Sequence, residues 1–212
     1  MAKGIHTEST FEQAIESNLL ENGGYVKGSS TDYDAQLGLF PSYITNFLKH
    51  SQPKAWDKIA NIHKEDVEKK VILPYTITNC WPSDGGGVSW LPDNNSFIYL
   101  HYPIVDNKSD SFLKNMVSVV YKIGSDPKII RPILSKKDYP ELNLKEEDFP
   151  IVSINKNNHN YLIAKIGGVA NFSDTYFADF SELNNKRISW KTLYKKEDKI
   201  TTTLKIIKVF LS

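Results

Sequence analysis

Apolar positions in the first third of the chain recur at the spacing of helices. One predicted helix covers residues 9–21 and carries its apolar side chains on one face: Phe11, Ala14, Ile15 and Leu19. Ser9 followed by Glu12 matches a capping box, in which both side chains satisfy backbone N–H groups at the start of a helix. Gly23 and Gly24 predict the end of this helix, because glycine adopts the left-handed cap conformation at little cost.

Two prolines predict the starts of two further helices. Proline suits the first helical position, since no N–H donor is needed there, and Pro41 and Pro53 each precede an apolar face. The two faces consist of Tyr43, Ile44, Phe47 and Leu48 in the first helix and Ala55, Trp56, Ile59 and Ala60 in the second. We expect the charged residues 64–70 to continue the last helix to about Ile72.

The pattern changes after Pro74 to short runs of β-branched and aromatic residues between turn signals. Their lengths are typical of antiparallel strands, and residues 155–160 match a hairpin connection. Residues 88–90 also have the composition of a strand. The longer runs are residues 96–102, 116–123, 129–134, 151–154, 161–166, 175–180 and 201–210. The sequence therefore predicts an α+β protein with a helical segment over residues 1–73 and a mainly antiparallel, β-rich domain over residues 74–212.

The overall charge narrows the classes of function. The chain has 26 basic and 25 acidic residues, which argues against a nucleic-acid footprint over the whole surface and against an acidic mimic of DNA. No apolar run approaches the roughly 20 residues that cross a bilayer, and residues 1–6 lack the apolar core of a signal peptide. We expect a soluble, cytoplasmic protein with no membrane partner.

The first seventy residues contain short segments in a characteristic order. These are HTESTFEQAIE at 6–16, LLENGGY at 19–25, YD at 33–34, LGLFP at 37–41, FL at 47–48, QP at 52–53 and Trp56. In order and spacing they resemble the N-terminal segment of the R (restriction) subunits of type I restriction endonucleases. The resemblance covers about residues 6–72 and does not extend into the β-rich part of the chain.

The resemblance implies a nuclease core of the PD-(D/E)xK type after this segment, followed by a DNA translocase. The chain has no ATPase or translocase motif, because no Gly-x-x-x-x-Gly-Lys-Ser/Thr loop is present. The Glu-x-Lys matches, at residues 68–70 and 197–199, lie in charged runs typical of a solvated surface. If the chain is an enzyme, the resemblance implies a metal-dependent endodeoxyribonuclease that uses Mg²⁺; no other cofactor is evident.

Two functions stay open at this point. In the first, the chain is a component, short relative or fragment of a type I R subunit that acts through DNA or through the modification complex. In the second, it is a non-catalytic binding or regulatory module with an R-like N-terminal segment. The partners expected from the first are DNA and restriction–modification subunits.

Few residues carry candidate chemistry. The resemblance implies that a glutamate on a helix ahead of the sheet lies near the metal, and Glu12 occupies such a helix, although closing the capping box also explains it. Cys80, His101 and Asp106 supply the residue types of a cysteine nucleophile, but a small buried cysteine explains Cys80 equally simply. No spacing of histidines predicts a metal site. The best candidate for contact with DNA is a basic run with interleaved aromatic residues: Lys186, Arg187, Trp190, Lys191, Tyr194, Lys195 and Lys196.

Overall fold

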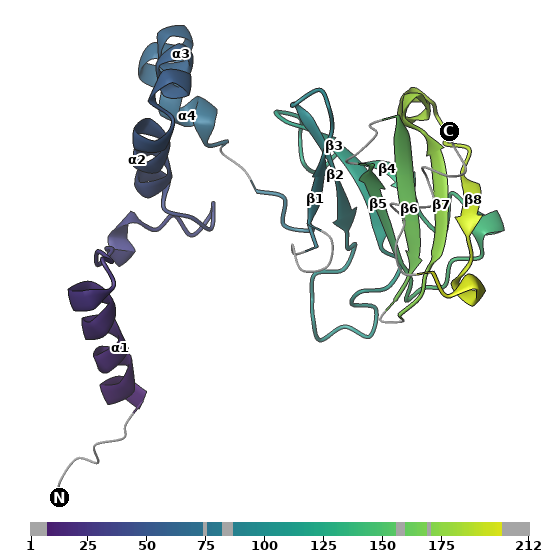
Figure 1. The fold of residues 1–212 in the computed structure, drawn as a ribbon, viewed down its shortest axis with the longest axis horizontal. Helices are drawn as coiled ribbons and strands as arrows, with labels where there is room; N and C mark the ends of the chain where they lie inside the picture. Colours follow the sequence, from purple (N-terminus) through teal and green to yellow (C-terminus); the bar gives the residue numbers. More distant parts are fainter. Residues whose placement is uncertain (1–7, 74–75, 82–86, 156–159, 169–170, 201–212) are drawn as a thin grey trace, which may run out of the picture. The chain divides into compact units, whose positions relative to one another are not determined.

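The chain forms two compact units, Met1–Thr76 and Ile77–Ser212, in a computed structural model. The structure describes residues 8–73, 76–81, 87–155, 160–168 and 171–200 (Figure 1). The first unit is helical and the second consists of antiparallel strands, so the predicted α+β class is confirmed. No helix in the described ranges is long and apolar enough to span a membrane.

The helices of the first unit begin where the prolines predict. The elements are α1 (Glu8–Asn22), η1 (Ser30–Asp32), α2 (Pro41–Ser51), α3 (Pro53–His63), η2 (Lys64–Asp66) and α4 (Val67–Val71). Both prolines occupy the first turn of their helices. The helix expected to run to about Ile72 is interrupted instead, because Lys64 has a φ of 48° and ends α3. A turn of 3-10 helix and the short α4 follow this break.

The two ends of α1 differ in how well the sequence predicts them. The helix begins at Glu8, so Ser9 lies inside the first turn and the predicted capping box of Ser9 and Glu12 is wrong. The glycine stop is confirmed: Gly24 has a φ of +69°. The N–H groups of Gly23 and Tyr25 both donate to the carbonyl of Leu19, at 3.0 and 3.2 Å.

The first unit buries little of its apolar surface. Among residues 8–73 only Thr45 is buried, and its hydroxyl bonds to carbonyls of its own helix. Tyr33, Phe40 and Tyr43 form a small aromatic group. The ring centroid of Phe40 lies 5.1 Å from that of Tyr33 and 5.5 Å from that of Tyr43. Most helix stability in proteins comes from packing of an apolar face, and these helices bury little apolar surface within their own unit.

The second unit contains two four-stranded sheets, each with its strands in sequence order and all neighbours antiparallel (Figure 1). The first sheet consists of β1 (Val88–Trp90), β2 (Ser96–His101), β3 (Val117–Lys122) and β4 (Arg131–Leu134). The second consists of β5 (Phe149–Ile154), β6 (Tyr161–Gly167), β7 (Asp174–Asp179) and β8 (Lys191–Tyr194). The sequence did not predict β8, and the strand expected at residues 201–210 lies outside the described residues.

The two sheets pack through one face each. The hydroxyl of Ser118 on β3 donates to the carbonyl of Pro150, at 2.6 Å, and accepts the N–H of Val152, at 3.0 Å. The hydroxyl of Ser89 on β1 accepts the N–H of Ile154, at 3.0 Å. These bonds join the first sheet to β5. The apolar core between and around the sheets includes Ile98, Leu134, Val152, Leu162, Ala164, Tyr176 and Ala178.

Candidate functional site

Helix α1 presents an apolar stripe to solvent. Phe11, Ile15 and Leu19 follow one another at intervals of four residues and therefore share one face of the helix. Their exposed fractions are 68%, 45% and 40%, and no residue of α1 is buried. We call these three residues the α1 stripe. Aligned apolar side chains on a helix are normally buried, so the stripe is a candidate binding surface.

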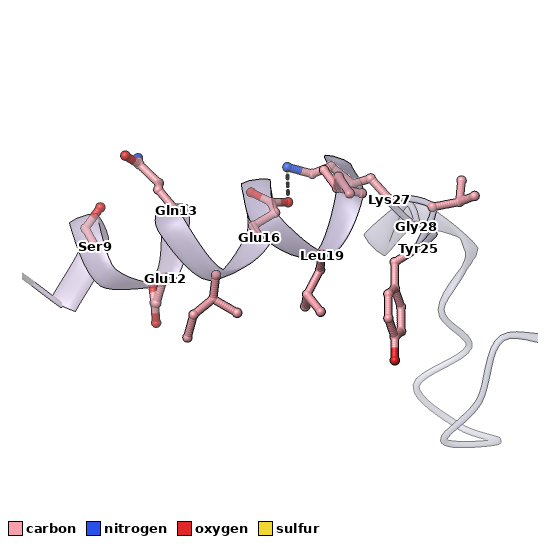
Figure 2. A pocket seen from close by; sticks show the side chains of 11 residues that line it. Ser9, Glu12, Gln13, Glu16, Leu19, Tyr25, Lys27 and Gly28 are labelled. Atoms are coloured by element: carbon pink, nitrogen blue, oxygen red, sulfur yellow. Dashed lines mark ion pairs between the residues drawn. The ribbon is translucent and has the colours of Figure 1, made fainter. Parts of the chain in front are cut away.

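A hollow of about 660 Å³ lies beside the stripe, between α1 and the chain that follows its glycine stop. Leu19 and Tyr25 project to one side of the helix, whereas Ser9 and Gln13 project to the other (Figure 2). Polar side chains also line the hollow, among them Glu12 and Gln13, and Lys27 forms an ion pair of 2.5 Å with Glu16 there. Apolar side chains and a charged rim together are typical of a protein-binding groove.

The sequence analysis did not include Tyr25 and Val26 in this surface. They line the hollow, and their exposed fractions are 64% and 91%. The sequence does contain a signal for them: they are an apolar pair directly after Gly23 and Gly24, which end the helix. A hydrophobic contact often accompanies such a helix end, so the pair could have been assigned to the surface of α1.

Glu12 lies on α1 and lines the same hollow. Its helical neighbours at one turn are Glu8 and Glu16, and Glu16 is paired with Lys27. Within the described ranges, no group of three or more His, Cys, Asp or Glu residues is placed to hold a metal ion. Proximity of Glu12 to a metal therefore stays a prediction of the resemblance. Of the two Glu-x-Lys matches, the first places Glu68 on α4, where it pairs with Lys49 at 2.9 Å.

The aromatic residues of the basic run face inward. Tyr194 on β8 is only 5% exposed, and Trp190 packs against the core between the sheets. Stacking of nucleic-acid bases requires an accessible ring face. Tyr194 is too buried for such stacking, and Trp190 is partly buried.

The cations of the basic run lie in different surroundings. Arg187 pairs with Glu141 at 2.5 Å and lies over the ring of Tyr139, at 4.9 Å from its centroid. Lys191 lies on β8 and is exposed, as are Lys186 and Lys196. The structure therefore does not gather the run into one continuous basic face.

Lys195 has a structural role. Its ammonium lies 3.3 Å from a carboxylate oxygen of Asp174 and 2.6 Å from the hydroxyl of Tyr176. Burial alone would lower the pKa of Lys195, but the hydroxyl of Tyr176 and the carboxylate of Asp174 raise the pKa above its ordinary value. Lys195 thus connects β8 to β7.

Two members of the candidate cysteine site lie together. Cys80 and His101 are partners in an isolated antiparallel bridge, whereas Asp106 lies in an exposed turn and accepts the N–H of Lys108 at 3.0 Å. Burial raises the pKa of the Cys80 thiol and lowers the pKa of His101. Both shifts favour the neutral forms, whereas a nucleophilic cysteine needs the thiolate.

We expect Cys80 to react slowly with thiol reagents. At pH 7.5 the native protein should be alkylated by iodoacetamide more slowly than the urea-unfolded chain, because burial disfavours the thiolate. Mass spectrometry of timed samples measures both rates in the same buffer. A native rate equal to or above the unfolded rate would show instead that the thiol is activated.

Acid should destabilise the second unit through His101. Its pKa in the folded protein lies below the ordinary value of 6.5, so the unfolded chain binds the proton more readily. The contribution of this group to stability is complete above about pH 6.5 and is lost as the pH falls toward the lowered pKa. Thermal unfolding between pH 7.5 and 5 should show a smaller acid loss in His101→Gln than in the wild type. His50→Gln, at an exposed position on α2 in the first unit, is the control and should lose as much stability in acid as the wild type; identical pH profiles for all three proteins would contradict this assignment.

Comparison with known proteins gives no family. No family model matches the chain, and no curated protein matches it. Prolyl oligopeptidase B from Galerina marginata, bound to a 35mer substrate, is 16% identical with a TM-score of 0.41 over 51% of this chain and 14% of that chain. A prolyl endopeptidase structure is 15% identical with a TM-score of 0.37, over 50% of this chain and 14% of that chain. The chain thus spans about one seventh of these proteins, and at this level the likeness supports no conclusion about fold, family or function.

Proposed function

We propose that the chain is a component of a type I restriction system, related to the R subunit over residues 6–72, that works by binding the modification complex. The α1 stripe is the contact surface. The observation that carries the proposal is the exposure of Phe11, Ile15 and Leu19 on one face of a helix with no buried residue. A cytoplasmic location, beside DNA, follows from this role.

The α1 stripe has the spacing of a helix that binds in an apolar groove. An amphipathic helix laid into an apolar groove is a recurring mode of recognition, with anchors spaced like those of the stripe. Burying a large apolar side chain stabilises a complex by about 1.5–3 kcal/mol before the costs of association. Three anchors, with Tyr25 beside them, contribute about 6–12 kcal/mol before those costs, which are themselves about 4–15 kcal/mol.

In this proposal the chain reaches DNA through the modification complex and not through the basic run. Arg187 and Lys195 are paired with carboxylates, and Tyr194 is buried, which weakens the case for a direct DNA contact there. No catalytic step is assigned to residues of this chain. Mg²⁺ would enter only as the cofactor of a nuclease, for which Glu12 alone is a candidate.

The alternative function has its own support. Two antiparallel sheets with strands in sequence order occupy the region where the resemblance implies a nuclease core. This arrangement favours a non-catalytic binding or regulatory module to which an R-like segment is attached. The two functions predict different partners. A restriction component binds the methyltransferase–specificity complex, whereas the module does not require that complex.

The deciding experiment mixes the purified chain with the methyltransferase–specificity complex of a type I system from the same source. Co-elution from a size-exclusion column, with no plasmid nicking in Mg²⁺ or Mn²⁺ beyond an EDTA control, is the expected result. Failure to co-elute at concentrations of about 50 µM would overturn the restriction role and leave the binding module. Metal-dependent nicking by the chain would overturn the non-catalytic assignment.

A further inference from the structure

Helix α1 carries carboxylates on the same side as its apolar stripe. Glu8, Glu12 and Glu16 recur at intervals of four residues, and we call these three residues the acidic row. Seven residues make nearly two turns of an α-helix, so residues seven positions apart point in almost the same direction. Glu8 precedes Ile15 by seven positions, and Glu12 precedes Leu19 by seven. The acidic row therefore lies beside the α1 stripe and not on the opposite side of the helix.

The side chains show the same arrangement. Glu12 projects to the same side of α1 as Leu19 and Tyr25, whereas Ser9 and Gln13 project to the other side (Figure 2). Glu12 and Leu19 also line the same hollow. A surface that covers the α1 stripe therefore also meets Glu12.

The chain leaves part of this negative charge unbalanced. Helix α1 contains four glutamates and no lysine, arginine or histidine. Glu16 is paired with Lys27, but among the described residues no ion pair involves Glu8 or Glu12, and both are exposed. Like charges four residues apart on a helix also repel each other. Two carboxylates beside the α1 stripe are thus available to a partner.

We propose that the surface which binds the α1 stripe is an apolar groove of a protein, bordered by lysine or arginine side chains that pair with Glu8 and Glu12. This inference rests on the proposed function, because it specifies the chemistry of the partner at the same helix face. Removing a carboxylate from water is unfavourable unless a cation or hydrogen-bond donors compensate it. A groove without cations would cover the stripe only by leaving Glu12 unpaired.

The cations of the partner lie along one border of the groove. Glu8 and Glu12 are one helical turn apart, which corresponds to roughly 6 Å along the axis, so their partners follow the helix at a similar spacing. The other border of the stripe contains Ala14 and Asn18, which are uncharged. This asymmetry fixes the direction in which α1 enters the groove. The same carboxylates repel phosphate groups, so this face of α1 does not contact DNA.

The test measures association of the full chain with the immobilised methyltransferase–specificity complex by surface plasmon resonance, at about 0.1 M and about 1 M salt. The screening length falls from about 10 Å to about 3 Å between these conditions. The wild-type association rate should fall at least about tenfold, because oppositely charged surfaces attract each other before contact. The double variant Glu8→Gln/Glu12→Gln should associate about tenfold more slowly than the wild type at low salt and should lose less than about threefold at high salt.

Reversing one charge supplies a matched pair of variants. Glu12→Lys places a cation against the cations of the groove and should slow association at low salt by at least about tenfold. Glu21→Lys makes the same change on the same helix, but residue 21 lies two positions after Leu19 and therefore on a different side. Its association rate should stay within about threefold of the wild type. Circular dichroism establishes that α1 is retained, and the neutral double variant keeps the test decisive if Glu12→Lys is unfolded.

The outcomes separate this inference from the proposed function. Binding with an association rate that salt does not change, or equal effects of Glu12→Lys and Glu21→Lys, would overturn the basic border and leave the α1 stripe as the contact. No binding of the wild type at either salt concentration would overturn the proposed function and this inference with it.

Discussion

Replacing Leu162 with alanine is expected to lower the free energy of unfolding of the second unit by about 2–5 kcal/mol. Leu162 is fully buried at the middle of the second sheet, where its register partners are Ile154 on β5 and Ala178 on β7. The substitution removes apolar contacts and leaves a cavity between the sheets. Urea denaturation followed by tryptophan fluorescence measures the change, since Trp81, Trp90 and Trp190 all lie in this unit.

Lys145→Ala is the control for the Leu162 variant. Its side chain is exposed, so the substitution should change the free energy of unfolding by less than about 0.5 kcal/mol. A loss below about 1 kcal/mol for Leu162→Ala would mean that β6 does not lie at the centre of the packed unit.

Replacing Leu19 with glutamate is expected to weaken binding to the methyltransferase–specificity complex by at least about tenfold, and by up to about a hundredfold. The loss has two causes, the apolar burial of a leucine, worth about 1.5–3 kcal/mol, and the cost of placing a carboxylate in an apolar groove. Leu19 is 40% exposed in the chain alone, so the substitution should leave the fold intact. Isothermal titration calorimetry gives the dissociation constants directly.

Ser17→Glu is the matched control for this prediction. It adds the same charge to the same helix, but residue 17 lies on the side of α1 away from the stripe. Binding by Ser17→Glu should stay within about twofold of the wild type. Equal losses for the two variants would assign the effect to helix charge, and no loss for Leu19→Glu would exclude the α1 stripe as the contact.

Local patterns predict much of this fold because they have local physical causes. The prolines at positions 41 and 53 start helices, since a fixed φ and a missing N–H suit the first turn. Gly24 ends α1 because the chain needs a positive φ there. The alternation along β6 likewise separates Leu162 and Ala164 from Lys165. Each of these signals lies within a few residues of the structure that it determines.

The errors in the predicted fold have physical reasons as well. Ser9 and Glu12 match a capping box, but the helix already begins at Glu8, which puts Ser9 inside α1. The pattern fixes the existence of a helix better than its first residue. Strand β8 is short and lies at a sheet edge, and its burial pattern leaves only Tyr194 buried. In the sequence, Lys191 and Thr192 therefore look like part of the surrounding charged surface segment and not like a strand.

The candidate residues depend on contacts that a linear sequence does not contain. Lys195 is near Lys196 in sequence, but its partners are Asp174 and Tyr176 on β7. Arg187 similarly pairs with Glu141, which lies 46 positions earlier. From their closeness in sequence we predicted that the basic residues share one surface. In the structure, ion pairs with residues far away in the sequence place them in different surroundings.

The most direct test of the proposed role is hydrogen–deuterium exchange of the chain with and without the methyltransferase–specificity complex. The proposal predicts slower exchange over residues 8–28, which include α1 and the hollow beside it, and little change over residues 186–196. Protection confined to the basic run, or no protection over residues 8–28 when the complex is in excess, would contradict the account.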